Sequence, residues 1–398
     1  MLKKLLLAIV LFFTIFSCSV EDLEEVGIGD SDTVVPLEPN EGVEVVLEEV
    51  LLEELSYNWI SNVQHSNGLL ESSENTDFVS LYDNALAALV FIQKGELEKA
   101  EKILAFFDTR VSGELMADSG GFYQFRNKEG TNGRRKWLGD NAWLLIAVNN
   151  YHEASGNPKY HRLAQELELW IRSLQDEDGG LWGGTEEDGT PIHKVTEGIA
   201  TAFNAVPGYD DFHKKILEYL EQYRWDPNKK TLIAWPENPQ YLNALDLHAI
   251  GQGVFQNFPK EQLYYADELF ITSQMATVSG KEVTGYCFDV DKDVIWLEGT
   301  AQMALAFKQL DDIPKTEKLL TELEKTFIAS TTMKDSEGIP YTSNHGSTYG
   351  PNPLWDRADI TPALSSTAWY LLAKTGFDPF AIGYEKNIPT SDMFWIQE

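Results

Sequence analysis

The sequence predicts an all-α protein whose twelve helices form six hairpins closed into an (α/α)6 toroid. Two observations predict this fold class: a unit that recurs at nearly constant spacing, and an alternation of two kinds of helix. Each unit consists of a Gly-rich or aromatic loop, an acidic residue, and a helix rich in small apolar residues. Such a repeat is the signature of an architecture built from stacked supersecondary units.

Five copies of the unit place an acid at the start of the apolar helix. These acids are Asp83, Asp140, Glu197, Asp246 and Glu298. Successive acids lie 57, 57, 49 and 52 residues apart, and a sixth copy at residues 365–369 lacks the acid. Open helical solenoids usually have shorter repeats, of about 33 to 47 residues, with tight loops. The long loops of this chain therefore favour a closed ring over a solenoid.

The helices that follow the acids are apolar on nearly every face, as in residues 86–91 and 142–148. A helix that is apolar all round is buried all round, so these helices form an inner layer. Six amphipathic, charged segments alternate with them and belong outside. We expect the outer helices near residues 43–65, 96–109, 158–175, 211–223, 260–275 and 314–329.

Residues 1–17 predict a lipoprotein signal peptide. Two lysines precede an uncharged apolar run, Leu5–Phe16, which is too short to span a bilayer. Residues 15–18, Ile-Phe-Ser-Cys, resemble a lipobox, which would make a lipidated Cys18 the first residue of the mature protein. Ordinary secretion with cleavage nearby is the alternative. If Cys18 is lipidated, Cys287 has no disulfide partner, because the chain has two cysteines.

An acidic flexible tether is expected over residues 18–42. Residues 18–55 hold thirteen acids and no base, and the first part of this stretch contains few aromatic residues. The acids directly after Cys18 resemble the surface-export signal of Bacteroidota lipoproteins, although a solvated acidic linker explains them as well. We therefore expect an outer membrane lipoprotein, held to the membrane by its lipid alone. The toroid domain, residues 43–398, would face the periplasm or the cell surface.

The charge of the domain limits its partners. Without the thirteen acids of residues 18–55 and the two signal lysines, 50 acids stand against 29 bases. Such a field repels nucleic acid, acidic lipid and strongly anionic polymers. We therefore expect a monomer that binds a neutral carbohydrate and no nucleic acid.

In a toroid the inner helices all begin at the same rim, so the five acids should converge there. The loops that enter these helices bring aromatic residues to the same rim, namely Phe122, Tyr123, Trp137, Trp182, Trp235, Tyr241, Tyr286, Trp296, Tyr349 and Trp355. Aromatic faces stack on sugar rings, and carboxyl groups supply the acid, base or nucleophile of glycoside chemistry. An acid at a helix start can also act as an N-terminal cap. Because Ser, Thr or Asn would cap equally well, we expect two or three of the five acids to be functional.

Asp140 is the first candidate catalytic residue, because Trp137 and Trp143 bracket it in the sequence. Glu298 follows, since its apolar neighbours would raise the pKa of its carboxyl, as suits a general acid. Asp83 is the third, because it and Asp140 begin consecutive inner helices. For substrate binding we expect Glu197, Asp246, Trp137, Trp182, Trp235, Trp296, Tyr241 and His248.

Two segments carry a family resemblance. Residues 139–143 (Gly-Asp-Asn-Ala-Trp) and 151–160 (Tyr-His-Glu-Ala-Ser-Gly-Asn-Pro-Lys-Tyr) resemble the stretch around the catalytic aspartates of bacterial α-1,6-mannanases. Those enzymes carry two adjacent aspartates, one nucleophile and one acid/base; here Gly139 stands at the first place, and only Asp140 matches. Over residues 43–380 the chain resembles the six-hairpin glycosidase superfamily, which implies the toroid but no single family or substrate. In position alone, Asp83 and Asp140 are also similar to the two aspartates of unsaturated glucuronyl hydrolases.

Other motifs give weaker evidence of function. Asp289, Asp291 and Asp293 alternate as in a calcium loop, but Val294 and Thr300 stand where an EF-hand needs Gly and Glu, so an acidic turn without a metal is expected. The histidines form no metal-binding pair, and phosphate-binding and dinucleotide-binding motifs are missing. We therefore expect no cofactor.

The sequence thus predicts a glycoside hydrolase acting on an oligo- or polysaccharide in a central cleft lined by carboxylates and aromatic residues. One alternative is a polysaccharide lyase, which would need a Tyr or His as base and an Arg or Lys to neutralise the carboxylate of a uronate. Arg126, Arg134, Arg135 and Arg357 are available for that role. Another alternative is a non-catalytic glycan-binding surface lipoprotein.

Overall fold

The computed structural model describes residues 41–349, 352–353, 357–384 and 386–397. Its inner helices are α2 (Leu81–Gln93), α4 (Leu138–Ser155), α6 (Thr196–Ala205), α8 (Asp246–Val254), α10 (Leu297–Gln309) and α12 (Leu364–Thr375). The helices that alternate with them along the chain are α1 (Glu41–Asn62), α3 (Leu97–Asp108), α5 (His161–Ser173), α7 (Asp211–Tyr223), α9 (Glu261–Phe270) and α11 (Ile313–Glu324). The chain divides into two units, Met1–Val45 and Val46–Glu398, and the features below belong to the second.

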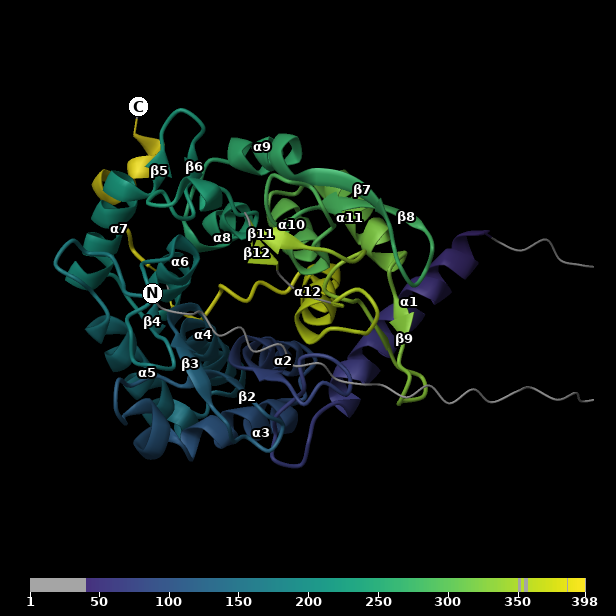
Figure 1. Cartoon of the computed structure of the whole chain (residues 1–398), viewed down its shortest axis with the longest axis horizontal. Coiled ribbons are helices and arrows are strands. Elements are labelled where there is room, and N and C mark those ends of the chain that lie inside the picture. Colours follow the sequence, from purple (N-terminus) through teal and green to yellow (C-terminus); the bar gives the residue numbers. More distant parts are fainter. Residues whose placement is uncertain (1–40, 350–351, 354–356, 385, 398) are drawn as a thin grey trace, which may run out of the picture. The chain divides into compact units, whose positions relative to one another are not determined.

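The inner helices form a closed ring. Each packs against the next along the chain, from α2 through α4, α6, α8 and α10 to α12, and α12 packs against α2. Each inner helix also packs against the outer helix that follows it, α2 against α3 and so on to α10 against α11 (Figure 1). This closure distinguishes a toroid from an open solenoid and confirms the predicted all-α (α/α)6 fold.

The composition of each layer explains its position. In α2 the residues from Ala85 to Phe91 are fully buried, and small residues such as Ala87 and Ala88 let neighbouring helices approach closely. The outer helix α5 buries one stripe only, Leu163, Leu167, Trp170 and Ile171, at the spacing of a single helix face. The sequence pattern therefore determines which helices are enclosed.

A repeated turn links successive hairpins. After α1, Gly68 has a φ of +96° and passes so close to the backbone of Lys102 that a Cβ would lie 2.2 Å from its carbonyl oxygen. After α5, Gly179 has a φ of +88° and makes the same approach to Lys215. Only glycine fits such positions without strain. The shared geometry shows the structural repeat that the sequence spacing indicated.

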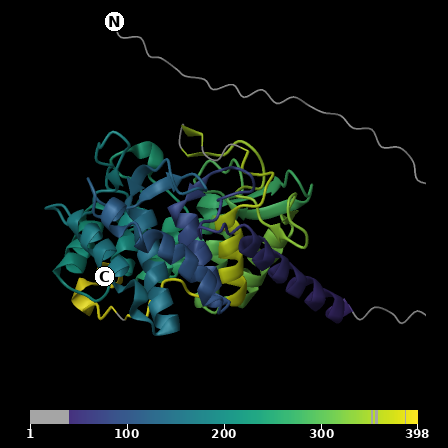
Figure 2. The ribbon, with the colours of Figure 1, turned by 90° about the horizontal axis from the view of Figure 1, so that it is seen from below.

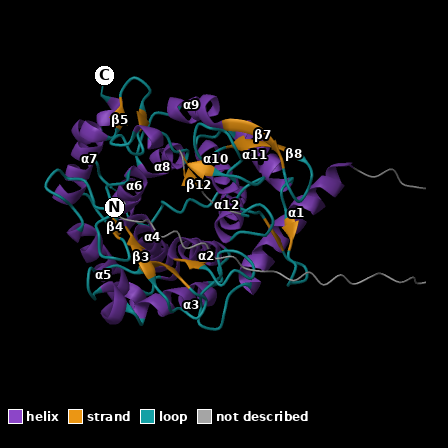
Figure 3. Cartoon of the chain, in the orientation of Figure 1, coloured by secondary structure: helices purple, strands orange, loops and turns teal. Residues whose placement is uncertain are grey.

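Short strands occupy the loops between the helices (Figures 2 and 3). An antiparallel sheet joins β1 (Val79–Ser80), β2 (Tyr123–Arg126), β3 (Arg134–Trp137) and β4 (Gly184–Thr185). Two-stranded pairs are formed by β5 (Trp225–Asp226) with β6 (Thr231–Leu232), β7 (Ile271–Met275) with β8 (Glu282–Tyr286), β9 (Ile328–Ala329) with β10 (Glu337–Gly338), and β11 (Thr348–Tyr349) with β12 (Asn352–Pro353). Single turns of π- or 3-10 helix cover Val111–Leu115, Pro158–Tyr160, Pro239–Tyr241, Thr390–Asp392 and Phe394–Ile396.

Two of the predicted outer helices are shorter than expected. The helix expected at 260–275 ends at Phe270, and Ile271–Met275 is the strand β7. The helix expected at 314–329 ends at Glu324, before the short strand β9. The segment after Phe270 leaves the helix because its backbone pairs with β8.

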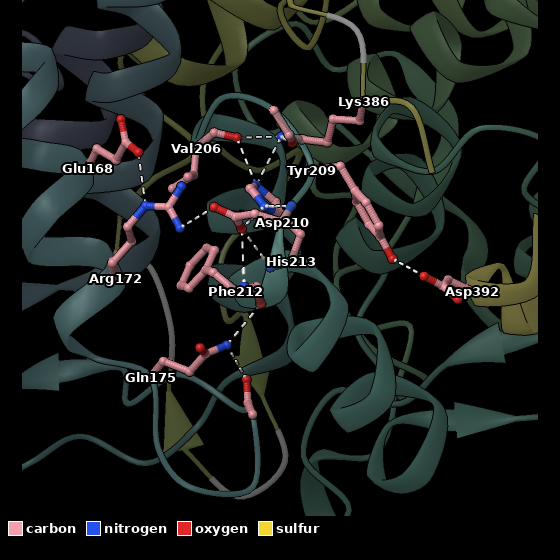
Figure 4. A network of polar contacts seen from close by, with 12 residues as sticks. Glu168, Arg172, Gln175, Val206, Tyr209, Asp210, Phe212, His213, Lys386 and Asp392 are labelled. Atoms are coloured by element: carbon pink, nitrogen blue, oxygen red, sulfur yellow. Dashed lines mark hydrogen bonds and ion pairs between the residues drawn. The ribbon is translucent and has the colours of Figure 1, made fainter. Parts of the chain in front are cut away.

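Polar contacts tie the C-terminal segment to α7 and the loop before it (Figure 4). Lys386 donates to the carbonyl oxygens of Val206 and Gly208, the latter at 3.2 Å. The Tyr209 hydroxyl donates to the Asp392 carboxylate at 2.7 Å. Burial lowers the pKa of Lys386 to about 7. These contacts hold Lys386 and Asp392 against the loop between α6 and α7.

Several predictions concern residues outside the described part of the chain. The signal peptide, the lipidation site Cys18 and tether residues 18–40 lie there, as does Trp355. Among the described residues, no helix combines the length and apolar character that crossing a membrane requires.

Candidate active site

The first turns of the inner helices surround a cavity of about 350 Å3. It is lined by Phe78, Ser80, Tyr82, Asp83, Gln124, Phe125, Asp140, Trp143, Glu197, Asp246, Ile250, Phe288, Trp296, Glu298, Gln302, Tyr341 and Ser365. All five acids of the repeat are present, and Ser365 represents the acid-free sixth unit. The predicted convergence of the five acids on one site is confirmed.

The five acids are not the N-caps of their helices. The N-cap residues are Ser80, Trp137, Val195, Leu245 and Trp296, and each acid falls within the first three helical residues instead. At that position the positive end of the helix dipole favours an ionised carboxyl, whereas burial favours the protonated form. Capping therefore does not explain why each unit carries an acid.

Three donors hold the Glu298 carboxylate. Its Oε1 accepts from the Tyr82 hydroxyl at 2.6 Å and from the Gln302 amide at 3.1 Å, and its Oε2 accepts from the Ser365 hydroxyl at 2.6 Å. The Trp369 indole donates to the Tyr82 hydroxyl at 2.7 Å and fixes its orientation. Burial raises the pKa of Glu298 to about 7 in spite of these donors.

Asp83 and Glu197 are also held by donors. The Tyr341 hydroxyl donates to Oδ2 of Asp83 at 2.9 Å. Oε1 of Glu197 accepts from the Thr201 hydroxyl at 3.1 Å, and the Trp137 indole also donates to this carboxylate. Burial raises the pKa of each carboxyl to about 6, and the donors limit the rise.

A close approach of α4 and α6 brings Glu197 beside Asp140. A Cβ on Gly198 would lie 3.3 Å from the backbone nitrogen of Gly139, so the two helices touch at their first turns. A Cβ on Gly139 would lie 2.7 Å from Oε2 of Glu197 and 3.0 Å from Nε1 of Trp137. An aspartate at position 139, as in the mannanase pair, would therefore need space that the Glu197 carboxylate occupies.

Asp140 and Asp246 differ from the other three acids because each has a buried oxygen without a hydrogen-bond partner, Oδ2 in Asp140 and Oδ1 in Asp246. Burial, followed by the negative charges of Glu197 and Asp83, raises the pKa of Asp140 well above its usual range. Burial and the charge of Glu197 raise the pKa of Asp246 to about 8. Both shifts favour the protonated form of the carboxyl.

Because their environments differ, the five carboxyl groups differ in protonation state at neutral pH. At pH 7, Asp83 and Glu197 are mostly ionised, Glu298 is near its midpoint and Asp246 is mostly protonated, while the raised pKa of Asp140 favours its protonated form. The negative charges of Glu197 and Asp83 both raise the pKa of Asp140. A proton donor flanked by ionised carboxylates is the arrangement from which acid and base roles are assigned.

The predicted aromatic residues fall into three groups. Trp296 lines the cavity, and Trp137 lies behind Glu197 as a donor. Trp235 stacks on Tyr241, with 5.4 Å between ring centroids. The rings of Tyr349 and Phe288 continue this series to Trp296, with centroid distances of 4.7 to 4.9 Å. Trp182 is 40% exposed and lies beneath the Lys194 ammonium instead of lining the cavity.

His248 lies in the core and not at the cavity. It is 3% exposed, its Nδ1 is 2.8 Å from the carbonyl oxygen of Gln262, and the Gln262 amide donates to the carbonyl of His248 at 2.8 Å. This placement removes the geometric basis for the substrate-binding role expected of His248. Its position two residues after Asp246 turns it to another face of α8.

Several cavity residues were missed from the sequence. Trp143, Ile250 and Gln302 follow Asp140, Asp246 and Glu298 by three or four residues. Helical periodicity places such residues on the same face as the acid, so this signal was available. The loop residues Phe78, Phe125, Phe288 and Tyr341 carry no comparable signal, because tertiary packing alone brings them to the cavity.

The acidic turn after β8 brings possible metal ligands together. Among the described residues, Cys287, Asp289 and Asp291 are the one set of three or more whose ligand atoms all lie within 4.8 Å of one another. The Thr348 hydroxyl donates to the Asp291 carboxylate at 2.6 Å. Because Cys287 is a buried thiol with a pKa raised by burial to about 12, the set does not resemble the all-oxygen cage of a calcium site.

No protein-family model matches the sequence, and no curated protein matches it. Solved structures do match its fold. A wild-type glycosidase superposes with a TM-score of 0.60 at 13% identity, covering 84% of this chain and 98% of its own. A cellobiose 2-epimerase from Bacillus thermoamylovorans B4167 gives a TM-score of 0.58 at 12% identity, covering 84% of this chain and 99% of its own.

An α-amylase from Clostridium perfringens is similar to the same degree, with a TM-score of 0.58 and 12% identity over 82% of this chain and 98% of its own. Identities this low establish the fold and leave the activity open. Together with the ring of inner helices, these matches show that the chain has the same fold as these solved structures, an (α/α)6 toroid.

Proposed function

We propose that the protein is a glycoside hydrolase in which Asp140 protonates the leaving-group oxygen. The observation that carries the proposal is the convergence of five buried or partly buried carboxyl groups in one cavity with aromatic walls. Glycoside hydrolysis needs two carboxyl groups with different protonation states, one acid and one base or nucleophile. The cavity offers both states, and the matching glycosidase and amylase structures support sugar-processing chemistry on this fold.

Asp140 suits the acid role because burial and the charges of Glu197 and Asp83 raise its pKa and favour the protonated carboxyl, and because its Oδ2 has no hydrogen-bond partner within the protein. Asp83 and Glu197 are ionised on either side of it and are the two candidates for base or nucleophile. Glu298 is the other catalytic candidate from the sequence. Both of its oxygens already accept hydrogen bonds, which suits a role in orienting the substrate.

The charges in the cavity disfavour the lyase alternative. Arg126 pairs with Glu114 at 2.7 Å, and Arg135 pairs with Glu186 at 3.3 Å. Among the described residues that line the cavity there is no arginine or lysine. Elimination from a uronate needs such a base to neutralise the sugar carboxylate, so a substrate without a carboxylate fits better.

The proposal is tested by turnover of a panel of aryl glycosides and oligosaccharides. We expect new reducing ends without the absorbance near 230 nm that marks elimination. We expect Asp140→Asn to lower kcat by at least about 100-fold, while Asp211→Asn, a matched change at an exposed acid on α7, leaves it unaltered. Sodium azide should restore part of the turnover in whichever of Asp83→Asn and Glu197→Gln removes the base or nucleophile.

Two outcomes would overturn the hydrolase. Glycan binding that survives Asp140→Asn, with no turnover by the parent protein, would indicate a non-catalytic glycan-binding protein. Conversion of a reducing sugar to its epimer without new reducing ends would indicate the chemistry named for the matching epimerase structure. The described lining of the cavity holds no histidine, so an epimerase here would depend on carboxyl groups for proton abstraction.

We also propose that the mature protein is an outer membrane lipoprotein and a monomer. The lipobox-like Ile-Phe-Ser-Cys at residues 15–18 supports the anchor. Metabolic labelling with a fatty acid should mark the wild-type chain and not Cys18→Ser. Light scattering of the domain released from its lipid should give the mass of one chain.

A further inference from the structure

The charge of the cavity is one-sided. Its described lining contains five carboxyl groups and no lysine, arginine or histidine. The bases on the bordering strands β2 and β3 are engaged elsewhere, Arg126 with Glu114 and Arg135 with Glu186. The ammonium of Lys136 lies 5.3 Å from the ring centre of Tyr123. The negative potential of the acids therefore has no positive partner within the cavity.

The acids are not gathered tightly enough to hold a small metal ion. The set within 4.8 Å of one another is Cys287, Asp289 and Asp291, and none of these lines the cavity. The cavity acids are instead spread over five helices around about 350 Å3. A positive ligand that contacts several of these acids at once must therefore extend across the cavity.

Two buried oxygens in the cavity also need donors. Oδ2 of Asp140, a residue only 7% exposed, has no hydrogen-bond partner, and the same holds for the buried Oδ1 of Asp246. Leaving such acceptors without donors costs free energy that a ligand can recover. An ammonium group offers three donors together with a charge, and its hydrogen bonds to carboxylates are the stronger, charge-assisted kind.

Aromatic rings complete the match. Trp143 and Trp296 line the cavity together with the acids. The faces of such rings stack on the apolar face of a sugar and also attract a cation. A ligand that combines a sugar ring with an ammonium group would therefore use both kinds of wall.

We propose that the cavity selects a sugar unit carrying a free, positively charged amino group over the corresponding neutral and N-acetylated sugars. This inference rests on the proposed function, because it names the substrate class of the same site. It departs from the sequence-based expectation of a neutral carbohydrate. The carboxylates of Asp83 and Glu197 supply the negative charge that attracts the ammonium group, the orphaned oxygens of Asp140 and Asp246 accept its hydrogen bonds, and the aromatic walls hold the ring.

Calorimetric titration of the mature protein with glucosamine, N-acetylglucosamine and glucose at about pH 6.5 tests the proposal, since an amine is protonated there. Glucosamine should bind at least about tenfold more tightly than glucose, the effect of one charge-assisted hydrogen bond. N-acetylglucosamine should lose this advantage. Asp140→Asn or Asp246→Asn should reduce the preference for glucosamine, whereas Asp211→Asn should leave it intact. Methylammonium, which lacks a sugar ring, should bind far more weakly.

The outcomes separate this inference from the proposed function. Equal or weaker binding of glucosamine than glucose overturns the amino-sugar preference, and turnover of neutral glycosides would then still support a hydrolase. A preference that survives both cavity variants also overturns it, because general attraction to an acidic protein would explain it. Glucosamine binding that depends on Asp140 or Asp246, without turnover of any glycoside, supports the inference and overturns the hydrolase.

Discussion

At the scale of single residues, Gly139 sets the geometry of the acid site. A methyl group there would lie 2.7 Å from Oε2 of Glu197 and 3.0 Å from Nε1 of Trp137, so Gly139→Ala must displace one or both. We expect a loss of about 1–3 kcal/mol in the free energy of unfolding, as for other overpacked sites. Turnover of the best substrate should fall by about 10- to 100-fold, because the carboxylate beside Asp140 moves.

Two controls isolate this effect. Gly113→Ala adds the same methyl group where nothing lies within 4 Å, and it should leave turnover unchanged. The double variant Gly139→Ala/Glu197→Asp shortens the acid and should recover part of the lost stability, measured by urea unfolding. Full activity and stability in Gly139→Ala would contradict the close contact between this glycine and Glu197.

The residue scale also shows how far the sequence could predict the site. The repeat identified all five acids, because a residue at a fixed place in each unit lies at a fixed place on the ring. Trp182 and His248 were misplaced, because proximity in sequence to a helix start does not fix the direction of a side chain. Tyr341 was missed because it reaches Asp83 across 258 residues, a contact that no local pattern records.

At the scale of elements, a buried hydrogen-bond pair joins α8 to α9. His248 and Gln262 exchange hydrogen bonds of 2.8 Å through a ring nitrogen, an amide and two backbone carbonyls. Burial lowers the pKa of His248 to about 4. Because the folded-state pKa lies below the ordinary value of 6.5, the unfolded chain takes up the proton first as the pH falls. As the pH falls from 6.5 to 4, His248 therefore lowers the free energy of unfolding by about 3 kcal/mol.

Comparison with His248→Phe measures that contribution. The variant lacks the titrating group, so its free energy of unfolding should fall less than that of the wild type between pH 6.5 and pH 4. At pH 7 it should be less stable, because the backbone carbonyl of Gln262 loses its partner. Parallel pH profiles for the two proteins would show that His248 is not a buried neutral imidazole.

Element boundaries were harder to predict than element types. The apolar and amphipathic periods located every helix of the ring, since burial on all faces or on one face has a direct sequence signature. The end of α9 was placed five residues too late. Residues 271–275 form a strand because β8 pairs with them, and this hairpin depends on a partner about ten residues further along the chain.

At the scale of the whole molecule, the ring closes because each of the six inner helices packs against an inner helix on both sides. Six inner helices that are each apolar all round leave no face for solvent, and the contact of α12 with α2 supplies the sixth interface. The same closure places five carboxyl groups around one cavity, where three are buried and two are partly buried. Their raised pKa values are therefore a property of the assembled ring.

This property predicts how stability depends on pH. The folded-state pKa values of Asp83, Glu197, Glu298 and Asp246, about 6, 6, 7 and 8, lie above their ordinary values. Each group therefore contributes stability that is complete near pH 4 and is lost as the pH rises through its folded pKa. Although His248 opposes this trend at the acid end, we expect the free energy of unfolding to fall by several kcal/mol between about pH 5 and pH 8.

Repulsion among surface charges also lowers the free energy of unfolding as the pH rises, since the chain carries a net charge of −32 at pH 7. Salt distinguishes this repulsion from the effect of the cavity carboxyl groups. About 1 M sodium chloride shortens the Debye length to roughly 3 Å and screens exposed charges, but it acts weakly on buried carboxyl groups. The fall in the free energy of unfolding with rising pH should therefore persist in salt.

The double variant Asp140→Asn/Asp246→Asn should make this fall smaller and raise the Tm at pH 8. Asp211→Asn/Glu221→Gln, which removes the same charge from the exposed face of α7, should do neither. The pH dependence of the free energy of unfolding could instead disappear in salt, or be the same in the cavity variant. Either result would show that surface charge causes it and that the carboxyl groups of the cavity do not.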